Sequence, residues 1–149
     1  RWDCAGEAPF RAVREAAKAR EFHGDYTILG SDIDPEAVAL ARANAQKAGV
    51  EHLVRFELAD ALRRDYPAQG ILCANPPYGE RMLEQQQARE LMRQFGRRMA
   101  GLKDGWRMYL ISSDEQFESA FGRRADKKRK LYNGRLKCNL HMYGERGRT

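Results

Sequence analysis

Cysteine is scarce in this sequence, and long apolar runs are missing. The three cysteines, Cys4, Cys73 and Cys138, are an odd number at unrelated spacings, which indicates neither a disulfide framework nor a zinc site. Cys73 lies in an apolar run, so we expect it to be a small core residue. No apolar stretch approaches the roughly 18 residues of a membrane-spanning helix, and no signal peptide is recognisable. We therefore expect a soluble cytoplasmic protein with no metal and no membrane contact.

Signatures of nucleophilic and phosphate-binding sites are also missing. His23, His52 and His141 are scattered without acidic or cysteine partners, and we expect them at surface or loop positions. No Ser/His/Asp arrangement stands out. The nearest candidate for a Gly-rich phosphate loop, residues 3–6, does not follow a strand. Neither a catalytic triad nor a dinucleotide loop is therefore indicated in this sequence.

Positive charge is concentrated near the end of the sequence. The whole sequence has a formal net charge of +6, whereas residues 123–149, with ten Lys or Arg against two Asp or Glu, carry +8. The remaining residues therefore carry about −2. A near-neutral body with a basic end favours a polyanionic partner, above all nucleic acid. The alternative is an ordinary solvated surface.

Helical and strand-like segments alternate along the 149 residues, which predicts one domain of α/β class. We expect helices at 9–17, 35–48, 85–102 and 114–121, and strands at 26–31, 53–58, 70–74, 106–112, 129–131 and 136–143. Asp34 is a suitable N-cap for the second helix, with Pro35 as its first residue and Gly49 after its end. The dipeptide Asn133-Gly134 predicts a hairpin turn between the last two strands.

Three successive strands of this pattern end in a polar residue: Asp32, Asp60 and Asn75. The carboxyl edge of a doubly wound parallel sheet is where ligands bind. Asp32 is suited to the two hydroxyls of a ribose, because a carboxylate accepts two hydrogen bonds. Asp60 can accept from the amine of an adenine, with the Ala61 amide at the ring edge. The alternative for Asp60 is a helix cap or turn residue. Because Asp32 and Asn75 lie at the neighbouring strand ends, the ligand role is favoured.

The segment Asn75-Pro76-Pro77-Tyr78 follows a short apolar strand. Two prolines fix the backbone and remove two N–H donors, so the loop is stiff and its carbonyls face outward. The Asn75 side-chain oxygen and the Pro76 carbonyl can then accept from one exocyclic NH2 group. Tyr78 offers a face on which a base can stack. Such a loop positions an amine and stabilises positive charge developing on its nitrogen.

These segments together resemble one enzyme family. The chain is similar to the catalytic domain of Rossmann-type methyltransferases that use S-adenosylmethionine, and more narrowly to the bacterial 23S rRNA guanine-N2 methyltransferases. The resemblance is carried by residues 30–35, 60–61, 75–81 and 124–134. The first two segments and Asn75-Pro76-Pro77-Tyr78 are shared by many amino-methylating enzymes. The extension Gly79-Glu80-Arg81 and the segment 124–134 are more particular to the rRNA enzymes.

The resemblance implies a mostly parallel, doubly wound sheet with a C-terminal antiparallel hairpin, and methylation of a guanine N2 in 23S rRNA. It implies three sets of site residues. The cofactor would be held by Asp32, Ile33, Asp60 and Ala61, and the target base by Asn75, Pro76, Pro77 and Tyr78. The RNA would be held by Arg81, Lys127, Lys128, Arg129, Lys130, Asn133 and Arg135.

The sequence departs from this family at its start. Family members begin the domain with a strand and an Asp-Pro-x-Cys-Gly-Ser-Gly loop for the methionine part of the cofactor, usually after an RNA-binding THUMP domain. Residues 1–149 begin just beyond these parts, so we expect a fragment of a longer methyltransferase that by itself binds the cofactor weakly or not at all. Three alternatives stay open: adenine N6 methylation in DNA or RNA, glutamine N5 methylation, and RNA binding without catalysis. The basic end argues against a protein substrate.

Overall fold

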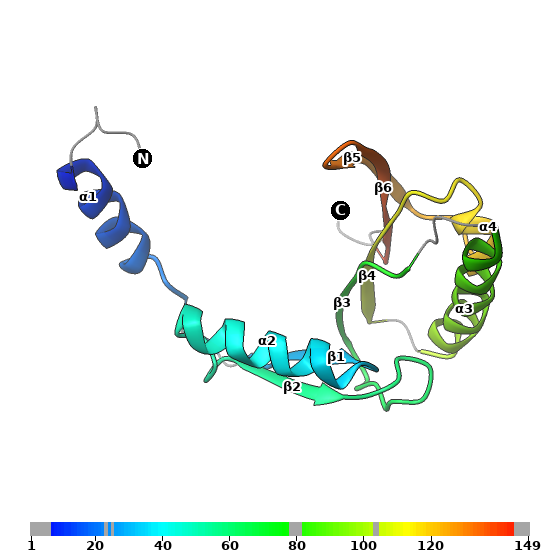
Figure 1. Ribbon diagram of the computed structural model, residues 1–149, viewed down its shortest axis with the longest axis horizontal. Helices are drawn as coiled ribbons and strands as arrows, with labels where there is room; N and C mark the ends of the chain where they lie inside the picture. The colour runs from blue at the N-terminus through cyan, green and yellow to red at the C-terminus, as the bar shows by residue number, and fades with distance from the viewer. Residues whose placement is uncertain (1–6, 23, 25, 78–81, 103–104, 145–149) are drawn as a thin grey trace.

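A computed structural model describes residues 7–22, 24, 26–77, 82–102 and 105–144 (Figure 1). The helices are α1 (Glu7–Lys18), α2 (Pro35–Ala48), α3 (Met82–Ala100) and α4 (Phe117–Phe121). The strands are β1 (Ile28–Asp32), β2 (Val54–Leu58), β3 (Gly70–Ala74), β4 (Trp106–Ser112), β5 (Lys127–Asn133) and β6 (Leu136–Tyr143). Each of the expected helices and strands is present, with shifts of a few residues at the ends.

The strands form two sheets. β1 and β2 pair in parallel, and a second sheet has the order β3-β4-β6-β5. In the second sheet β3 and β4 are parallel, whereas β6 runs antiparallel to both β4 and β5. The expected α/β fold with parallel strands and a C-terminal antiparallel hairpin is confirmed. Within the described residues β1 and β3 each pair on one side only, so the parallel strands do not form one continuous sheet.

The β1–α2–β2 unit follows its local sequence signals. The Asp34 carboxylate accepts from the Glu36 amide at 2.9 Å, as an N-cap does. The helix ends at Gly49, whose φ of 70° permits its amide to bond back to the last turn. The packing of α2 on β1 and β2 buries Val38 and Ala45. These contacts hold the end of β1 next to the start of α2.

The main core lies between the second sheet and helices α3 and α4, which cover one of its faces (Figure 1). α3 contributes Met92, Phe95 and Met99, as its helical periodicity predicts. The other buried core residues are Met108, Leu110, Phe117, Ala120, Phe121 and Tyr143. Gly96 lets α3 approach α4 closely, because a Cβ there would overlap the Phe121 carbonyl.

The connection between β2 and β3 is fixed against the second sheet by aromatic and polar contacts. Tyr66 packs edge-on against Trp106, with ring centroids 5.6 Å apart. The Trp106 indole donates to the Pro67 carbonyl at 3.0 Å, and Arg98 of α3 donates to the Arg64 carbonyl at 2.9 Å. Burial raises the pKa of the Tyr66 hydroxyl. The cluster attaches the first unit to the start of β4.

Two expectations about single residues are wrong. Cys73 is exposed rather than buried, because β3 turns Leu72 and Ala74 toward the core and Cys73 to the opposite face. His141 is buried rather than at the surface, since β6 is an interior strand and its ring packs on Phe117. Among the described residues, no helix is both long enough and apolar enough to cross a membrane.

Candidate active site

Asp32 closes β1 and lies at the carboxyl edge of the first sheet. One carboxylate oxygen accepts from the Asp34 amide at 2.9 Å, and the Asp32 carbonyl accepts from the Ala59 amide at 2.9 Å. Its second carboxylate oxygen has no hydrogen bond within the described part of the chain. The next residue, Ile33, is 71% exposed. The end of β1 therefore presents an acceptor and an apolar side chain next to each other.

Asp60 follows β2 at the same edge. Its carboxylate accepts from the Leu62 amide at 2.8 Å and lies 3.5 Å from the Arg63 Nε. These are the contacts of a turn residue, the alternative that the sequence left open. Ala61 is exposed beside it, and its carbonyl accepts from the Tyr66 hydroxyl at 2.9 Å. The structure thus brings Asp32 and Asp60 to one edge, with Asp60 already engaged locally.

Arg64 is a site residue that the sequence does not single out. Its guanidinium donates to the Ser31 hydroxyl at 2.8 Å and pairs with the Glu57 carboxylate at 2.6 Å. The side chain is only 14% exposed. Arg64 therefore ties the end of β1, at the residue before Asp32, to the end of β2. No local pattern signals this role, because Ser31 is 33 residues away and Glu57 lies on a strand while Arg64 lies in the connection after it.

The reactive-loop candidate begins where β3 ends. Asn75 and Pro77 are exposed, and the Asn75 side chain makes no hydrogen bond within the described residues. Pro77 borders a hollow of about 300 Å³ whose other wall is α3, through Glu84, Gln87, Ala88 and Leu91. Tyr78 lies outside the described residues. The loop thus has an available amide side chain at Asn75, and a small open hollow borders its Pro77.

A second long-range contact holds the helix that follows this loop. Arg89 of α3 pairs with Asp114, just beyond β4, through two hydrogen bonds of 2.7 and 2.8 Å. Asp114 also accepts from the Gln116 amide at 3.0 Å, and its own amide donates to Ser112. The hydrogen bond from Arg89 holds the pKa of the Asp114 carboxyl below its usual range. The pair fastens α3 to the carboxyl end of β4 and was not expected from the sequence.

The basic residues expected to hold RNA lie mainly on β5, an edge strand. Strand alternation places Lys127 and Arg129 on one face and Lys128 and Lys130 on the other. Lys128 is engaged, because its Nζ lies 2.6 Å from the Glu118 carboxylate. Arg135 is exposed in the hairpin loop. Arg81 and the Asn133 side chain lie outside what the structure describes.

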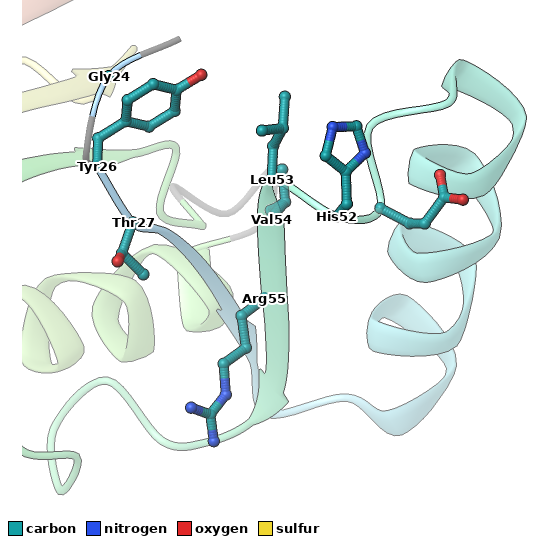
Figure 2. Close-up of a pocket in the computed structure, with 8 residues that line it drawn as sticks. Gly24, Tyr26, Thr27, His52, Leu53, Val54 and Arg55 are labelled. Atoms are coloured by element: carbon teal, nitrogen blue, oxygen red, sulfur yellow. The ribbon is translucent and has the colours of Figure 1, made fainter.

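One hollow near the first sheet lies at the edge opposite to the expected cofactor residues. It measures about 370 Å³ and is bordered by residues that precede β1 and by residues before and at the start of β2, among them Tyr26, Thr27 and His52 (Figure 2). These residues surround the amino ends of the two parallel strands, opposite Asp32 and Asp60. None of the expected site residues borders it. In the described ranges no three His, Cys, Asp or Glu side chains gather as metal ligands would.

Comparison with known proteins places this arrangement in a family. The family described as "RMKL-like, methyltransferase domain" matches residues 3–142. The chain belongs to this methyltransferase-domain family. Its relatives include the ribosomal RNA large subunit methyltransferase K/L of Shewanella sp. strain ANA-3, 40% identical over 95% of this chain and 21% of that protein. Another is YpsC of Bacillus subtilis strain 168, named as an RNA methyltransferase, at 34% identity over 95% and 37%.

Solved members of the methyltransferase group share the fold. SMU.472, named as a methyltransferase and solved in complex with SAH, superposes with a TM-score of 0.84 at 37% identity, over 99% of this chain and 40% of that one. A protein from Listeria monocytogenes, named as an N6-adenine-specific DNA methylase, gives 0.79 at 31% identity over 95% and 37%. The chain spans about a fifth to two fifths of the length of these relatives.

Proposed function

We propose that this chain is the catalytic part of an enzyme that transfers a methyl group to the N2 amine of a guanine in 23S rRNA. The observation that carries the proposal is the Asn75 side chain, exposed at the carboxyl end of β3 and without a hydrogen bond among the described residues. Two prolines stiffen the loop behind it. An amide acceptor held in this way suits an exocyclic amine.

The residues present fit the nucleoside half of S-adenosylmethionine, the methyl donor that we propose. The open carboxylate oxygen of Asp32 suits a ribose hydroxyl, and the exposed Ile33 side chain suits the apolar face of an adenine. Ala61 and Asp60 lie at the same edge and suit the polar edge of that ring. The bound cofactor supplies an electrophilic methyl group. No described residue is suited to the methionine half, so that part of the site depends on other segments.

The proposed chemistry needs positioning rather than a nucleophile. The Asn75 Oδ1 and the Pro76 carbonyl would accept hydrogen bonds from the two N–H groups of the target amine. These bonds would fix the direction of its lone pair. The same oxygens would stabilise the positive charge that develops on nitrogen as the new N–C bond forms and the bond from the methyl carbon to the sulfur of the donor breaks. The nitrogen would then release one proton to solvent, which restores a neutral amine. Tyr78 would stack on the target base after that base has flipped out of the RNA helix. The Arg89–Asp114 pair supports the loop indirectly by holding α3.

Two features support RNA as the substrate. Relatives with up to 40% identity are named as ribosomal RNA methyltransferases. The basic β5–β6 hairpin matches a polyanion, and its binding should weaken steeply with salt. A second candidate is methylation of adenine N6, favoured by the name of the Listeria relative. Mass spectrometry of nucleosides, after incubation of the full-length enzyme with rRNA and with DNA, separates the two products.

Replacement of Asn75 tests the mechanism. In the full-length enzyme, Asn75→Ala should lower the rate of methylation at least about 100-fold, because an oxygen that stabilises developing charge is lost. RNA affinity should stay within about twofold of the unaltered enzyme. Asn44→Ala, which removes an exposed amide from α2, is the matched control and should leave both values unchanged. Methylation by Asn75→Ala at the normal rate would overturn the mechanism.

We also propose that a further strand of the parent protein lies between β1 and β3. Each of these strands has one unpaired edge within the described residues. Ile28, Leu29 and Ile71 on them are 43–57% exposed, which is unusual for strands of a parallel sheet. A strand inserted there would pair with both edges and join the two sheets. Its loop would then lie at the same edge as Asp32 and Asn75.

A further inference from the structure

We propose that one face of the β5–β6 hairpin, formed by Lys130, Tyr132 and Lys137, binds an unpaired stretch of the RNA by stacking one base on Tyr132. This proposal rests on the proposed RNA substrate and adds where on the enzyme the RNA lies beyond the target base. It also says which basic residues of the hairpin contact the RNA, namely Lys130 and Lys137. The surface is called the hairpin platform below.

Strand register defines the platform. β5 and β6 pair with Tyr132 opposite Lys137 and Lys130 opposite Asn139, so these four side chains share one face. This is the face on which α4 packs against His141, further along the hairpin. The opposite face carries Leu131, Cys138 and Leu140, together with the cations Lys127 and Arg129. Both faces of the hairpin are thus basic, but near the tip only the first combines cations with an exposed aromatic ring among the described side chains.

The platform lies at the edge of the sheet where the reactive loop begins. β4 pairs with β6 up to Ser112, opposite Asn139, and the hairpin continues for three more residue pairs. At the usual rise of a strand the tip extends about 10 Å past the end of β4. Figure 1 shows it rising above β4, at the same end of the sheet as the end of β3. Three strand spacings, roughly 15 Å, separate β5 from β3. RNA bound at Asn75 can therefore reach the platform.

The chemistry of the platform fits an unpaired base. Tyr132 is 65% exposed, so its ring is accessible to a base. The Lys130 Nζ lies 5.5 Å from the centroid of its ring, and Lys137 is directly across the strands. An exposed ring flanked by two cations matches a base together with its neighbouring phosphates. Bases in a duplex offer no open face to such a ring, so single-stranded RNA is the occupant.

Lys128 is on the same face but belongs to the fold rather than to the platform. Its ammonium is paired with Glu118 of α4, and Glu118 also accepts from the Ala125 amide at 2.7 Å. This contact attaches the base of the hairpin to α4. The pair leaves Lys130 and Lys137 as the cations of this face available to phosphates. The end of the hairpin near α4 is therefore fixed, and its tip is exposed.

Binding of a fluorescein-labelled single-stranded RNA oligonucleotide to the full-length enzyme tests the platform by anisotropy. Tyr132→Ala should weaken binding about ten- to 100-fold, the loss expected for one stacked base. Tyr132→Phe keeps the ring and should bind normally. Lys130→Ala and Lys137→Ala should each reduce the slope of log affinity against log salt by about 0.7. Arg97→Ala, which removes an exposed charge from the far end of α3, is the matched control and should leave the slope unchanged.

The outcomes separate this proposal from the proposed function. Unchanged RNA affinity in Tyr132→Ala, in an enzyme that still methylates rRNA, would overturn the platform alone. If Tyr132→Ala loses RNA affinity but the unaltered enzyme forms no N2-methylguanine, the proposed reaction is overturned and the platform stays in place. A larger loss in Arg129→Ala than in Lys130→Ala would assign the RNA to the opposite face. Tighter binding of duplex RNA than of the single strand would exclude stacking as its basis.

Discussion

At the scale of single residues, His141 is a polar side chain buried without hydrogen-bond partners among the described residues. It is 3% exposed, its ring centroid lies 4.5 Å from that of Phe117, and neither ring nitrogen has a hydrogen-bond partner in the described structure. Burial lowers the pKa of the imidazole, the nearby Glu118 carboxylate opposes this shift, and the Lys128 ammonium adds to it. The folded protein therefore holds a neutral imidazole in an apolar position.

This environment predicts how stability depends on pH. Because the pKa of His141 is lower in the folded state, the unfolded state binds more protons, and stability is lost as the pH falls below about 6.5, the value for an unfolded histidine. His141→Phe removes the titrating group and two unpartnered polar atoms. We expect the variant to be at least as stable at pH 7.5, and to lose less stability than the unaltered protein between pH 7 and 5.

Urea unfolding at several pH values checks this. His52→Gln removes an exposed imidazole at the amino edge of β2 and is the control, which should keep the pH dependence of the unaltered protein. An equal loss of stability on acidification in His141→Phe and in the unaltered protein would exclude His141 as the cause.

At the scale of elements, the packing of α3 on α4 depends on one glycine. The Cβ of an alanine at Gly96 would overlap the backbone carbonyl of Phe121, which cannot move without displacing α4. Phe121 and Phe95 are both buried in the main core beside this contact. The close approach of the two helices therefore requires that residue 96 has no side chain. The conformational flexibility of glycine is not what is needed here.

Gly96→Ala should lower the free energy of unfolding by about 1–3 kcal/mol, the usual cost of overpacking, despite the better helix propensity of alanine. Gly101→Ala is the matched control, because its Cβ would lie 3.5 Å from the Arg98 carbonyl, an ordinary contact. Urea unfolding of both variants measures the difference. Equal stability of Gly96→Ala and Gly101→Ala would show that α4 adjusts at no cost.

The hairpin shows how an element can be expected correctly and still differ in detail. The dipeptide Asn133-Gly134 correctly indicated a turn between two strands. In the structure Asn133 pairs with Leu136, so the loop residues are Gly134 and Arg135, with Gly134 at a φ of 61°. Strand pairing extends one residue further than turn propensity suggests, which also turns Tyr132 and Lys137 to one face.

At the scale of the whole molecule, the division into two sheets has a functional consequence. Asp32 and Asp60 lie at the edge of one sheet, Asn75 lies at the edge of the other, and no described strand pairs β1 with β3. The proposed nucleoside half of the cofactor site and the proposed amine site are thus on separate sheets. Their relative position would be fixed by the strand that we propose between them.

Cofactor affinity measures this dependence. We expect residues 1–149 alone to bind S-adenosylmethionine weakly or not at all by calorimetry, because no described residue suits the methionine half of the cofactor and no described strand joins β1 to β3. The full-length enzyme should bind S-adenosylmethionine with the affinity usual for an enzyme and its cofactor. Low-micromolar binding by residues 1–149 alone would contradict this prediction.

The sequence by itself determined the features that depend on neighbouring residues. The capping of α2 by Asp34, its end at Gly49, the apolar face of α3 and the exposed Asn75 after a short strand all follow from contacts within a turn or from strand and helix periodicity. The family motifs lie in the same local segments. Each of these signals is contained in fewer than 20 residues, so no knowledge of the fold was needed to find it.

Only the tertiary structure decided which of these features meet. The burial of His141, the exposure of Cys73, the anchoring of Arg64 and the Arg89–Asp114 pair depend on partners in other elements or on which face a neighbouring element covers. The basic run of β5 looks uniform in sequence, yet strand pairing divides it between two faces and engages Lys128 with Glu118. Composition gives the charge of a segment, whereas register decides where each charge points.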